Sequence, residues 1–293
     1  MEIVDGIYLI MNPHRHYFVS SCLIVGDSLT LVDAGREESP EASIYPYIRG
    51  LRRDPSEISL VILTHAHWDH CAGAARIRRD SGCRVAVHRN GIPYLKDPKL
   101  LNRERAEQFP GVPLRGMEFE AVEPDIDFLD GDVLSIQGRK LRVVHTPGHS
   151  SCSCCIVEEK QGIFIAGDSI QGRGEGRPLI FQSVDTYVDS MKRLLDMPIE
   201  GIVCGHPFPP FEKALLRGEE TSMHIRESMN AVEELINLVR RTLESSRKPM
   251  NLMQVHKAAS AAPLYTIGCV LESLVAQEDA QRLKIGNEQL WAV

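Results

Sequence analysis

The chain has 293 residues, 43% hydrophobic and 25% charged, an ordinary composition for a soluble globular protein long enough to bury a large core. Its formal net charge of −7 argues against nucleic acid as the main partner, because phosphate binding needs a concentrated positive field. No apolar stretch approaches the length that spans a bilayer, and residues 1–5 carry acids where a secretory signal carries basic residues. We therefore expect a cytoplasmic protein with no membrane partner.

The eight cysteines are expected to be buried, reduced thiols. Cys152, Cys154 and Cys155 crowd one apolar stretch, and Cys22 precedes an apolar run at residues 23–25. The paired Cys-x-x-Cys units that a zinc knuckle needs are absent from the sequence.

The first 35 residues have the pattern of β-structure, and residues 19–25 and 28–32 predict a hairpin around a Gly-Asp turn. A helical stretch follows at residues 41–53. The run Leu-Val-Ile-Leu at residues 60–63 shows no alternation of apolar and polar side chains, which is typical of a strand buried on both faces.

Strands and helices then alternate as far as residue 204. Residues 92–125 contain five prolines and mixed charge, and we expect this insert to line a binding site. Helices are predicted at residues 72–79 and 184–195, and strands at residues 85–88, 133–136, 141–145, 153–157, 163–166 and 202–204.

From Glu212 onward the pattern changes to helices. A long amphipathic helix is predicted at residues 224–244, followed by shorter ones at about 252–261 and 265–277 and then an apolar–polar alternation up to Trp291. This order is typical of a small winged-helix-like unit. We therefore divide the chain into a catalytic domain, residues 1–212, and a C-terminal domain, residues 213–293.

The segment His65-Ala66-His67-Trp68-Asp69-His70 follows the buried strand at residues 60–63 and supplies half of a two-metal site. Residues i and i+2 of an extended chain point the same way, so His65 and His67 can bind one ion together. Asp69 and His70 lie beyond the strand end, where a turn can direct both at a second ion. Imidazole and carboxylate suit zinc, iron and manganese.

Three further metal-type residues each follow an apolar strand. His149 lies in the loop Thr-Pro-Gly-His-Ser, Asp168 follows Gly167, and His206 follows Gly205. One histidine after a strand is usually a hydrogen-bonded loop residue, and one aspartate there is usually a turn former. Seven such residues at strand ends are poorly explained in that way, and catalytic residues are often placed like this on α/β scaffolds.

These motifs resemble those of the metallo-β-lactamase superfamily, and Leu-Val-Asp-Ala-Gly at residues 31–35 is similar to the family's early strand and turn. The resemblance covers about residues 1–212. It implies an α/β fold, the αββα sandwich of the metallo-β-lactamase type, here with a small α-rich C-terminal domain. It also implies that Asp33 supports the metal ligands and that the metals lie in a cleft at the sheet edges.

By this resemblance, two divalent ions are bound, zinc by preference, with iron or manganese as alternatives. Asp168 bridges the two ions, as in glyoxalase II and its relatives, whereas the zinc β-lactamases place a cysteine or histidine at that point. The implied ligands are His65, His67 and His149 for one ion and Asp69, His70 and His206 for the other. Cys71 and Pro207 depart from the usual residues beside the second ion.

The predicted mechanism is hydrolysis by a metal-bridging hydroxide. Two ions roughly 3.5 Å apart would lower the pKa of a bridging water toward neutrality, and the hydroxide would attack a carbonyl or phosphoryl centre. Asp69 is the predicted catalytic residue, since it would orient the hydroxide and shuttle a proton. The acidic net charge and the absence of a long RNA-gripping insert favour a small-molecule thioester, lactone or related ester as substrate.

Three other functions remain open. A metal-dependent endoribonuclease or phosphodiesterase would use the same ligands, and His224, Arg226 and Glu227 on the long helix resemble a subset of superfamily hydrolases that includes an endoribonuclease-like protein. A mononuclear iron persulfide dioxygenase would need only His65, His149 and Asp168. A non-catalytic binding module would use the C-terminal unit. The oligomeric state is open, a homodimer included.

Overall fold

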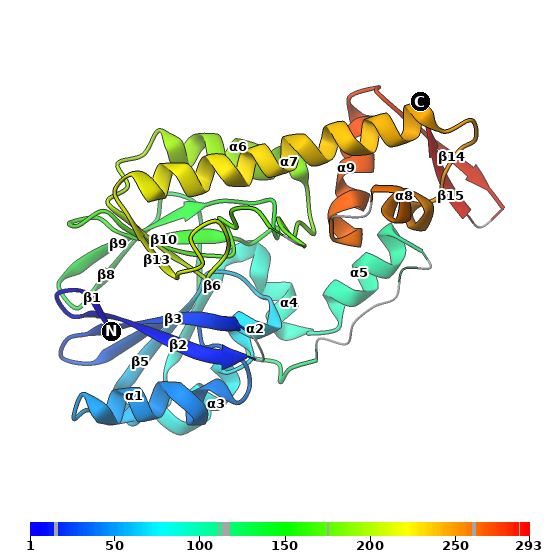
Figure 1. The fold of residues 1–293 in the computed structure, drawn as a ribbon. Coiled ribbons are helices and arrows are strands. Elements are labelled where there is room, and N and C mark those ends of the chain that lie inside the picture. Colours follow the sequence, from blue (N-terminus) through cyan, green and yellow to red (C-terminus); the bar gives the residue numbers. More distant parts are fainter. Residues whose placement is uncertain (15–16, 111, 113–117, 175, 260–261, 287) are drawn as a thin grey trace.

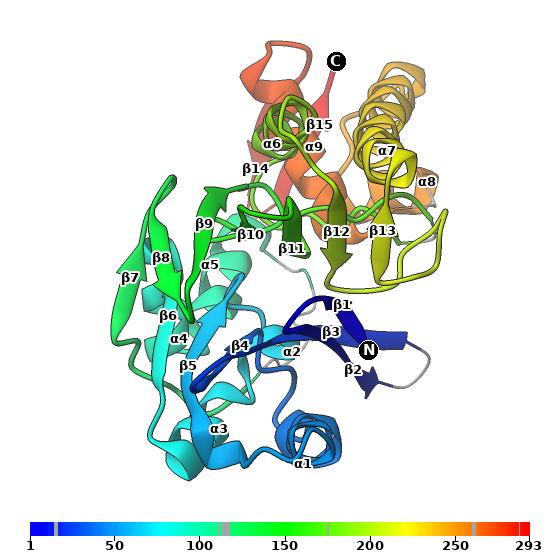
Figure 2. The ribbon, with the colours of Figure 1, turned by 90° about the vertical axis from the view of Figure 1, so that its left-hand side faces the viewer.

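Two β-sheets lie face to face, and helices cover the outer side of each (Figure 1, Figure 2). The computed structural model of the chain describes residues 1–14, 17–110, 112, 118–174, 176–259, 262–286 and 288–293. The two facing sheets with helices on their outer sides confirm the predicted αββα sandwich.

The first sheet has seven strands in sequential order. They are β1 (Glu2–Val4), β2 (Ile7–His14), β3 (Tyr17–Val25), β4 (Leu29–Val32), β5 (Ile58–Leu63), β6 (Arg84–His88) and β7 (Ile126–Phe128). Neighbours from β1 to β4 pair antiparallel, and those from β4 to β7 pair parallel. The predicted hairpin of β3 and β4 is confirmed.

The second sheet has six strands in the order β13-β12-β11-β10-β9-β8. They are β8 (Val133–Ile136), β9 (Arg139–His145), β10 (Cys154–Glu158), β11 (Ile163–Gly167), β12 (Gly201–Cys204) and β13 (Leu215–Arg217). All neighbours pair antiparallel except β11 and β12, which are parallel because α6 (Val184–Leu195) connects them.

Three apolar clusters fill the spaces between the four layers. One lies between α1 (Tyr45–Gly50), α3 (Ala74–Ser81) and the first sheet, one between the two sheets, and one between the second sheet and the helices α6 and α7 (Glu219–Ser245). Strand β5 contributes Val61 and Leu63 to the first cluster and Leu60 and Ile62 to the second. Its unbroken apolar run is thus explained by burial on both faces.

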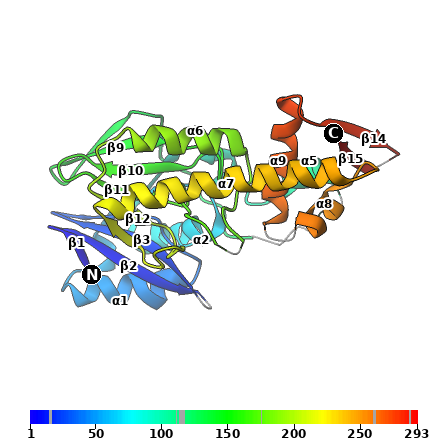
Figure 3. The same cartoon turned by 45° about the horizontal axis from the view of Figure 1, so that its top comes forward.

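The C-terminal part continues the outer helical layer. Helix α7 runs along the second sheet and reaches α8 (Leu252–Ala259), α9 (Leu264–Ala276) and the hairpin of β14 (Gln281–Ile285) and β15 (Glu288–Ala292) (Figure 1, Figure 3). Residues of all these helices and Trp291 of β15 belong to the cluster under α6. The predicted order of two helices and a hairpin is confirmed.

The prediction that the helical pattern begins at Glu212 was wrong, because β13 follows that residue, pairs with β12 and completes the second sheet. Three residues are too few to produce a recognisable alternation, and the pairing partner is not local in sequence. The division at residue 212 stays a prediction, and the apolar cluster shared across it favours a C-terminal part that packs as an extension of the sandwich.

The insert at residues 92–125 contains α4 (Ile92–Lys96) and α5 (Leu100–Gln108), and residues 111 and 113–117 of it lie outside the described residues. Helix α5 lies beside α9 (Figure 1), where the Phe109 ring packs so closely on Gly268 that an added Cβ would lie 2.5 Å from the ring. The insert is thus held between the sandwich and the C-terminal part.

All eight cysteines are free and buried, as predicted. Among the described ranges, no single helix is long and apolar enough to cross a membrane, and α8 and α9 meet such a test only as a pair joined through a 110° bend.

Candidate metal centre

All seven predicted site residues lie together at one edge of the two sheets. His65 and His67 follow β5, Asp69 and His70 lie in α2 (Trp68–Cys71), and His149, Asp168 and His206 follow β9, β11 and β12. Their donor atoms form three groups in which all atoms lie within 4.8 Å of one another. These groups are His65, His67 and His149; His65, His70 and Asp168; and Asp69, His70 and His206.

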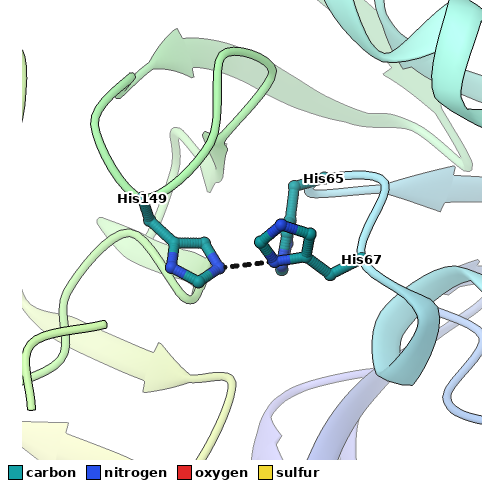
Figure 4. Close-up of side chains that lie close together, drawn as sticks. All are labelled: His65, His67 and His149. Atoms are coloured by element: carbon teal, nitrogen blue, oxygen red, sulfur yellow. Dashed lines mark hydrogen bonds between the residues drawn. The ribbon is translucent and has the colours of Figure 1, made fainter. Parts of the chain in front are cut away.

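The first triad consists of His65, His67 and His149. Figure 4 shows the three rings converging from the strand end of β5 and from the loop after β9. The Nδ1 atom of His67 and the Nε2 atom of His149 lie 2.7 Å apart (Figure 4). All three side chains are at most 6% exposed.

The second triad consists of Asp69, His70 and His206. The Nε2 atom of His206 lies 3.3 Å from a carboxylate oxygen of Asp69. Asp168 stands between the triads, with Oδ1 3.4 Å from Nε2 of both His70 and His206 and Oδ2 3.6 Å from Nε2 of His149. Its two oxygens therefore face different triads, as a bridging carboxylate requires.

Asp33 fixes two of these imidazoles from behind. It accepts hydrogen bonds from the backbone N–H and the hydroxyl of Thr64, and its Oδ2 accepts from Nδ1 of His70 at 2.8 Å. Since the Thr64 hydroxyl donates to Asp33, its oxygen can accept from Nδ1 of His65, 3.1 Å away. Both histidines thus carry the proton on Nδ1 and direct the Nε2 lone pair into the site.

Two further imidazoles are oriented by backbone carbonyls. Nδ1 of His149 donates to the Leu179 carbonyl at 2.6 Å, and Nδ1 of His206 donates to the Phe18 carbonyl at 2.8 Å. The side-chain amide of Gln171 donates to the same Leu179 carbonyl and lies 3.0 Å from the His149 ring. Their Nε2 atoms, too, are left as acceptors that face the site.

The residues fit a bound cation. Nε2 of His65, Nε2 of His70 and Oδ1 of Asp168 are buried and have no hydrogen-bond partner among the described residues. Buried polar atoms are normally paired, because an unpaired one loses its hydration without replacement. Imidazole nitrogen and carboxylate oxygen are also the atoms that zinc, iron and manganese accept as ligands.

The pKa values of four of these histidines shift in opposite directions, because burial lowers all of them and nearby carboxylates raise one. Burial lowers the pKa of His65 and His67 well below the usual value and that of His149 to about 4. Burial would also lower the pKa of His70, but the carboxylates of Asp168, Asp33 and Asp69 raise it well above the usual value. The second triad is therefore surrounded by more carboxylates than the first.

Close packing of two loops requires glycine. A Cβ at Gly205 would lie 2.5 Å from Oδ1 of Asp168, and one at Gly167 would lie 2.3 Å from Oγ1 of Thr64. The backbone of Gly167 also has a φ of +49°, which side chains other than glycine rarely adopt. These glycines allow the loops after β11 and β12 to approach each other closely enough to share Asp168.

A cavity of about 250 Å³ opens beside the first triad. Helices α4 and α5 contribute much of its wall, so the insert lines this cavity, and its role as a binding site stays a prediction. The lining includes Ala66, His67, Tyr94, Leu101, Arg105 and Phe181. No described residue after 212 lines it, although Tyr265 of α9 packs behind Phe181, with ring centroids 5.4 Å apart.

The sequence reading missed Arg105, Gln171 and Thr64. Arg105 is only 4% exposed, and its guanidinium lies 3.4 Å from Nε2 of His67. The sequence gives no clear signal for it, since Arg105 is one of four charged residues in α5. Burial lowers the pKa of Arg105 only to about 10, so the guanidinium stays charged near neutral pH.

The model of the metallo-beta-lactamase superfamily matches residues 15–206. Among curated proteins, the acyl-coenzyme A thioesterase MBLAC2 of Bos taurus is 29% identical over 178 residues, covering 54% of this chain and 61% of that protein. A hydroxyacylglutathione hydrolase of Cereibacter sphaeroides is 26% identical over 198 residues, covering 64% of each. The chain thus spans less than two thirds of the length of these relatives.

Solved structures share the fold over the whole chain. A metallo-beta-lactamase family protein from Thermus thermophilus superimposes with a TM-score of 0.80 at 19% identity, covering 99% of both chains. A beta-lactamase domain protein from Burkholderia ambifaria gives a TM-score of 0.73 at 18% identity, covering 100% of this chain and 94% of the other. The arrangement of the C-terminal part is therefore a shared feature of the fold.

Proposed function

This chain belongs to the metallo-beta-lactamase superfamily, and on that premise we propose that it is a dinuclear metal-dependent hydrolase that cleaves thioesters. The membership confirms the resemblance that the sequence motifs indicated. The observation that carries the proposal is the pair of triads on either side of Asp168, each with converging buried donor atoms.

We assign one divalent ion to each triad, with Asp168 giving one oxygen to each. His65, His67 and His149 would hold the first ion, and Asp69, His70 and His206 the second. Seven donors are too many for one ion, and a mononuclear iron site built on His65, His149 and Asp168 would leave the second triad without a role. Zinc fits the donor set best, and iron or manganese fit it too.

Bound divalent ions would supply a Lewis acid for the carbonyl and a water of lowered pKa as nucleophile. The chain's own residues would orient the reacting groups and the metal ligands and exclude bulk water. Asp69, whose side chain is 15% exposed, is placed to accept the proton of the attacking water, and Asp33 and the Phe18 and Leu179 carbonyls hold the imidazoles fixed. Loss of an acceptor that orients a metal ligand in this way typically lowers metal affinity or activity roughly 10- to 100-fold.

The proposed substrate is a thioester rather than a phosphodiester. Two relatives carry thioester hydrolysis in their names, the bovine acyl-coenzyme A thioesterase and the bacterial hydroxyacylglutathione hydrolase. The net charge of −7 also disfavours a polyanionic nucleic acid as substrate. A small molecule suits the cavity of about 250 Å³ beside the first triad.

The test combines metal analysis with turnover. We expect close to two divalent ions per chain in the purified protein, and hydrolysis of acyl thioesters in preference to lactones and to bis(p-nitrophenyl) phosphate. One tightly bound iron that His70→Ala leaves in place would overturn the dinuclear assignment and favour the dioxygenase. Faster cleavage of the phosphodiester than of every thioester would overturn the substrate class.

A further inference from the structure

Arg105 is a buried cation that the proposed hydrolysis does not use. Its side chain is 4% exposed, and its guanidinium carbon lies 3.7 Å from the centroid of the Phe181 ring and 5.2 Å from that of Tyr265. Stacking on Phe181 supports the flat face of the guanidinium. Its N–H groups lie in the guanidinium plane, so stacking leaves them to find acceptors elsewhere.

Acceptors for these N–H groups are scarce. Within the described ranges, Arg105 forms no ion pair with a carboxylate, and its Nε atom is buried without a hydrogen-bond partner. Glu104 is the one acid among the cavity-lining residues, but its side chain is exposed and accepts from the Tyr94 hydroxyl instead. A buried charge without an anionic partner is costly, so its retention points to a ligand that supplies the missing anion.

The contact with His67 places this anion next to the metal centre. Nε2 of His149 is an acceptor, so the proton in the 2.7 Å contact belongs to Nδ1 of His67. A cation that takes the place of this proton leaves His67 protonated on Nε2, which faces Arg105 at 3.4 Å. The N–H groups of Arg105 and the Nε2–H group of His67 would then face the same space. An oxygen anion that reaches both would accept hydrogen bonds from them.

We propose that Arg105 binds a carboxylate carried by the acyl group of the substrate, so that this protein prefers thioesters of short dicarboxylic acids. The proposal rests on the proposed hydrolase function and names its substrate class. One imidazole ring separates Arg105 from the metal position, which places the bound anion a few bonds from the scissile carbonyl. The phosphates of coenzyme A are separated from the thioester by the whole pantetheine arm and do not meet this requirement.

The test compares glutaryl with pentanoyl thioesters of N-acetylcysteamine, which have equal acyl length and a leaving group without phosphate. We expect kcat/KM to be at least roughly tenfold higher for the glutaryl thioester, mainly through KM, because a charge-assisted pair is gained on binding. In Arg105→Gln the ratio of kcat/KM for the glutaryl thioester to that for the pentanoyl thioester should fall toward one. In Arg105→Lys, which keeps the charge without the planar fork, it should fall only part of the way.

Arg103→Gln is the matched control, since Arg103 is an exposed residue of the same helix that pairs with Asp97. It should keep the full glutaryl preference. Equal rates on both thioesters in the wild type, or an unchanged ratio in Arg105→Gln, would overturn the proposal. So would a loss confined to the corresponding coenzyme A thioesters, because the anion would then be a phosphate of the leaving group.

Calorimetric titration of glutaramate into the purified protein separates this proposal from the proposed function. We expect binding that weakens at least roughly tenfold in Arg105→Gln and not in Arg103→Gln. Glutaramate binding of this kind without cleavage of any thioester would overturn the hydrolase function and leave the anion site standing. Thioester cleavage without Arg105-dependent binding would overturn the anion site and leave the function standing.

Discussion

The two triads of the candidate metal centre have similar burial but differ in charge. The first contains three neutral imidazoles, His65, His67 and His149, and faces a single acid, Asp168. The second contains Asp69 and is backed by Asp33, whose carboxylate contacts His70. The carboxylates raise the pKa of His70, whereas burial lowers that of His149 to about 4.

This difference in charge favours different chemical roles for the two bound ions. Asp168 would be shared by both ions, but the first triad adds only neutral ligands, so an ion there would keep more of its positive charge and be better placed to polarise a carbonyl. An ion in the second triad would be compensated by Asp69, with Asp33 behind His70, and Asp69 would be placed to accept the proton of the attacking water. The cavity with Arg105 opens at the first triad, in agreement with a carbonyl bound on that side.

The largest expected effect is at Asp168, the residue that the two triads share. Asparagine offers one good oxygen donor and no charge to offset two dications, so Asp168→Asn should lower turnover at least roughly 10³-fold and weaken at least one metal site, with the fold retained. Metal analysis, circular dichroism and thioester turnover would measure this. The control is Asp189→Asn, since the Asp189 side chain is 74% exposed on α6. Full activity with two metals in Asp168→Asn would remove Asp168 from the bridge.

The triads should also be separable by loss of one ligand each. His149→Ala removes a donor of the first triad only, and His70→Ala one of the second, so each variant should retain about one tightly bound metal per chain and lose most of the activity. Elemental analysis after gel filtration gives the stoichiometry. Two metals retained in both variants would show that the triads are not separate sites.

A smaller effect is expected from the groups behind the ligands. Asp33→Asn removes the charge that Nδ1 of His70 contacts, so metal affinity of the second triad should fall roughly 10- to 100-fold. Gln171→Met should cost less, because the Leu179 carbonyl still accepts from His149. Competition with a chelator measures both affinities. If Asp33→Asn and Gln171→Met lost the same amount of metal affinity, the negative charge of Asp33 would not be what distinguishes the triads, and positioning of the imidazoles would explain both losses.

Most of the strands, the helix α6 and the grouping of the seven candidate site residues could be predicted because their signals are local. Apolar runs mark β5, β11 and β12, and the residues that follow each run are of the metal-binding type. The groups that orient them could not be predicted. The Phe18 carbonyl is 188 residues from His206 in sequence, and Gln171 is 22 residues from His149.

Arg105 illustrates the same limit. In sequence it is one charge among several on α5, and its burial depends on Phe181 and Tyr265, which fold onto it from distant parts of the chain. Strand β13 was missed for a related reason, since three residues form a strand only because β12 offers a free edge. Contacts between elements distant in sequence decide both cases.

The smallest expected effect is a difference in metal preference between the triads. Carboxylate oxygen favours harder ions such as manganese, and imidazole favours zinc. The second triad offers Asp69, so in protein reconstituted with equal amounts of zinc and manganese the manganese should enter there preferentially, by roughly a few-fold. Electron paramagnetic resonance would detect the manganese, and His70→Ala should abolish the signal while His149→Ala leaves it. A signal lost in His149→Ala and kept in His70→Ala would reverse the assignment, and charge would then not be what distinguishes the two triads.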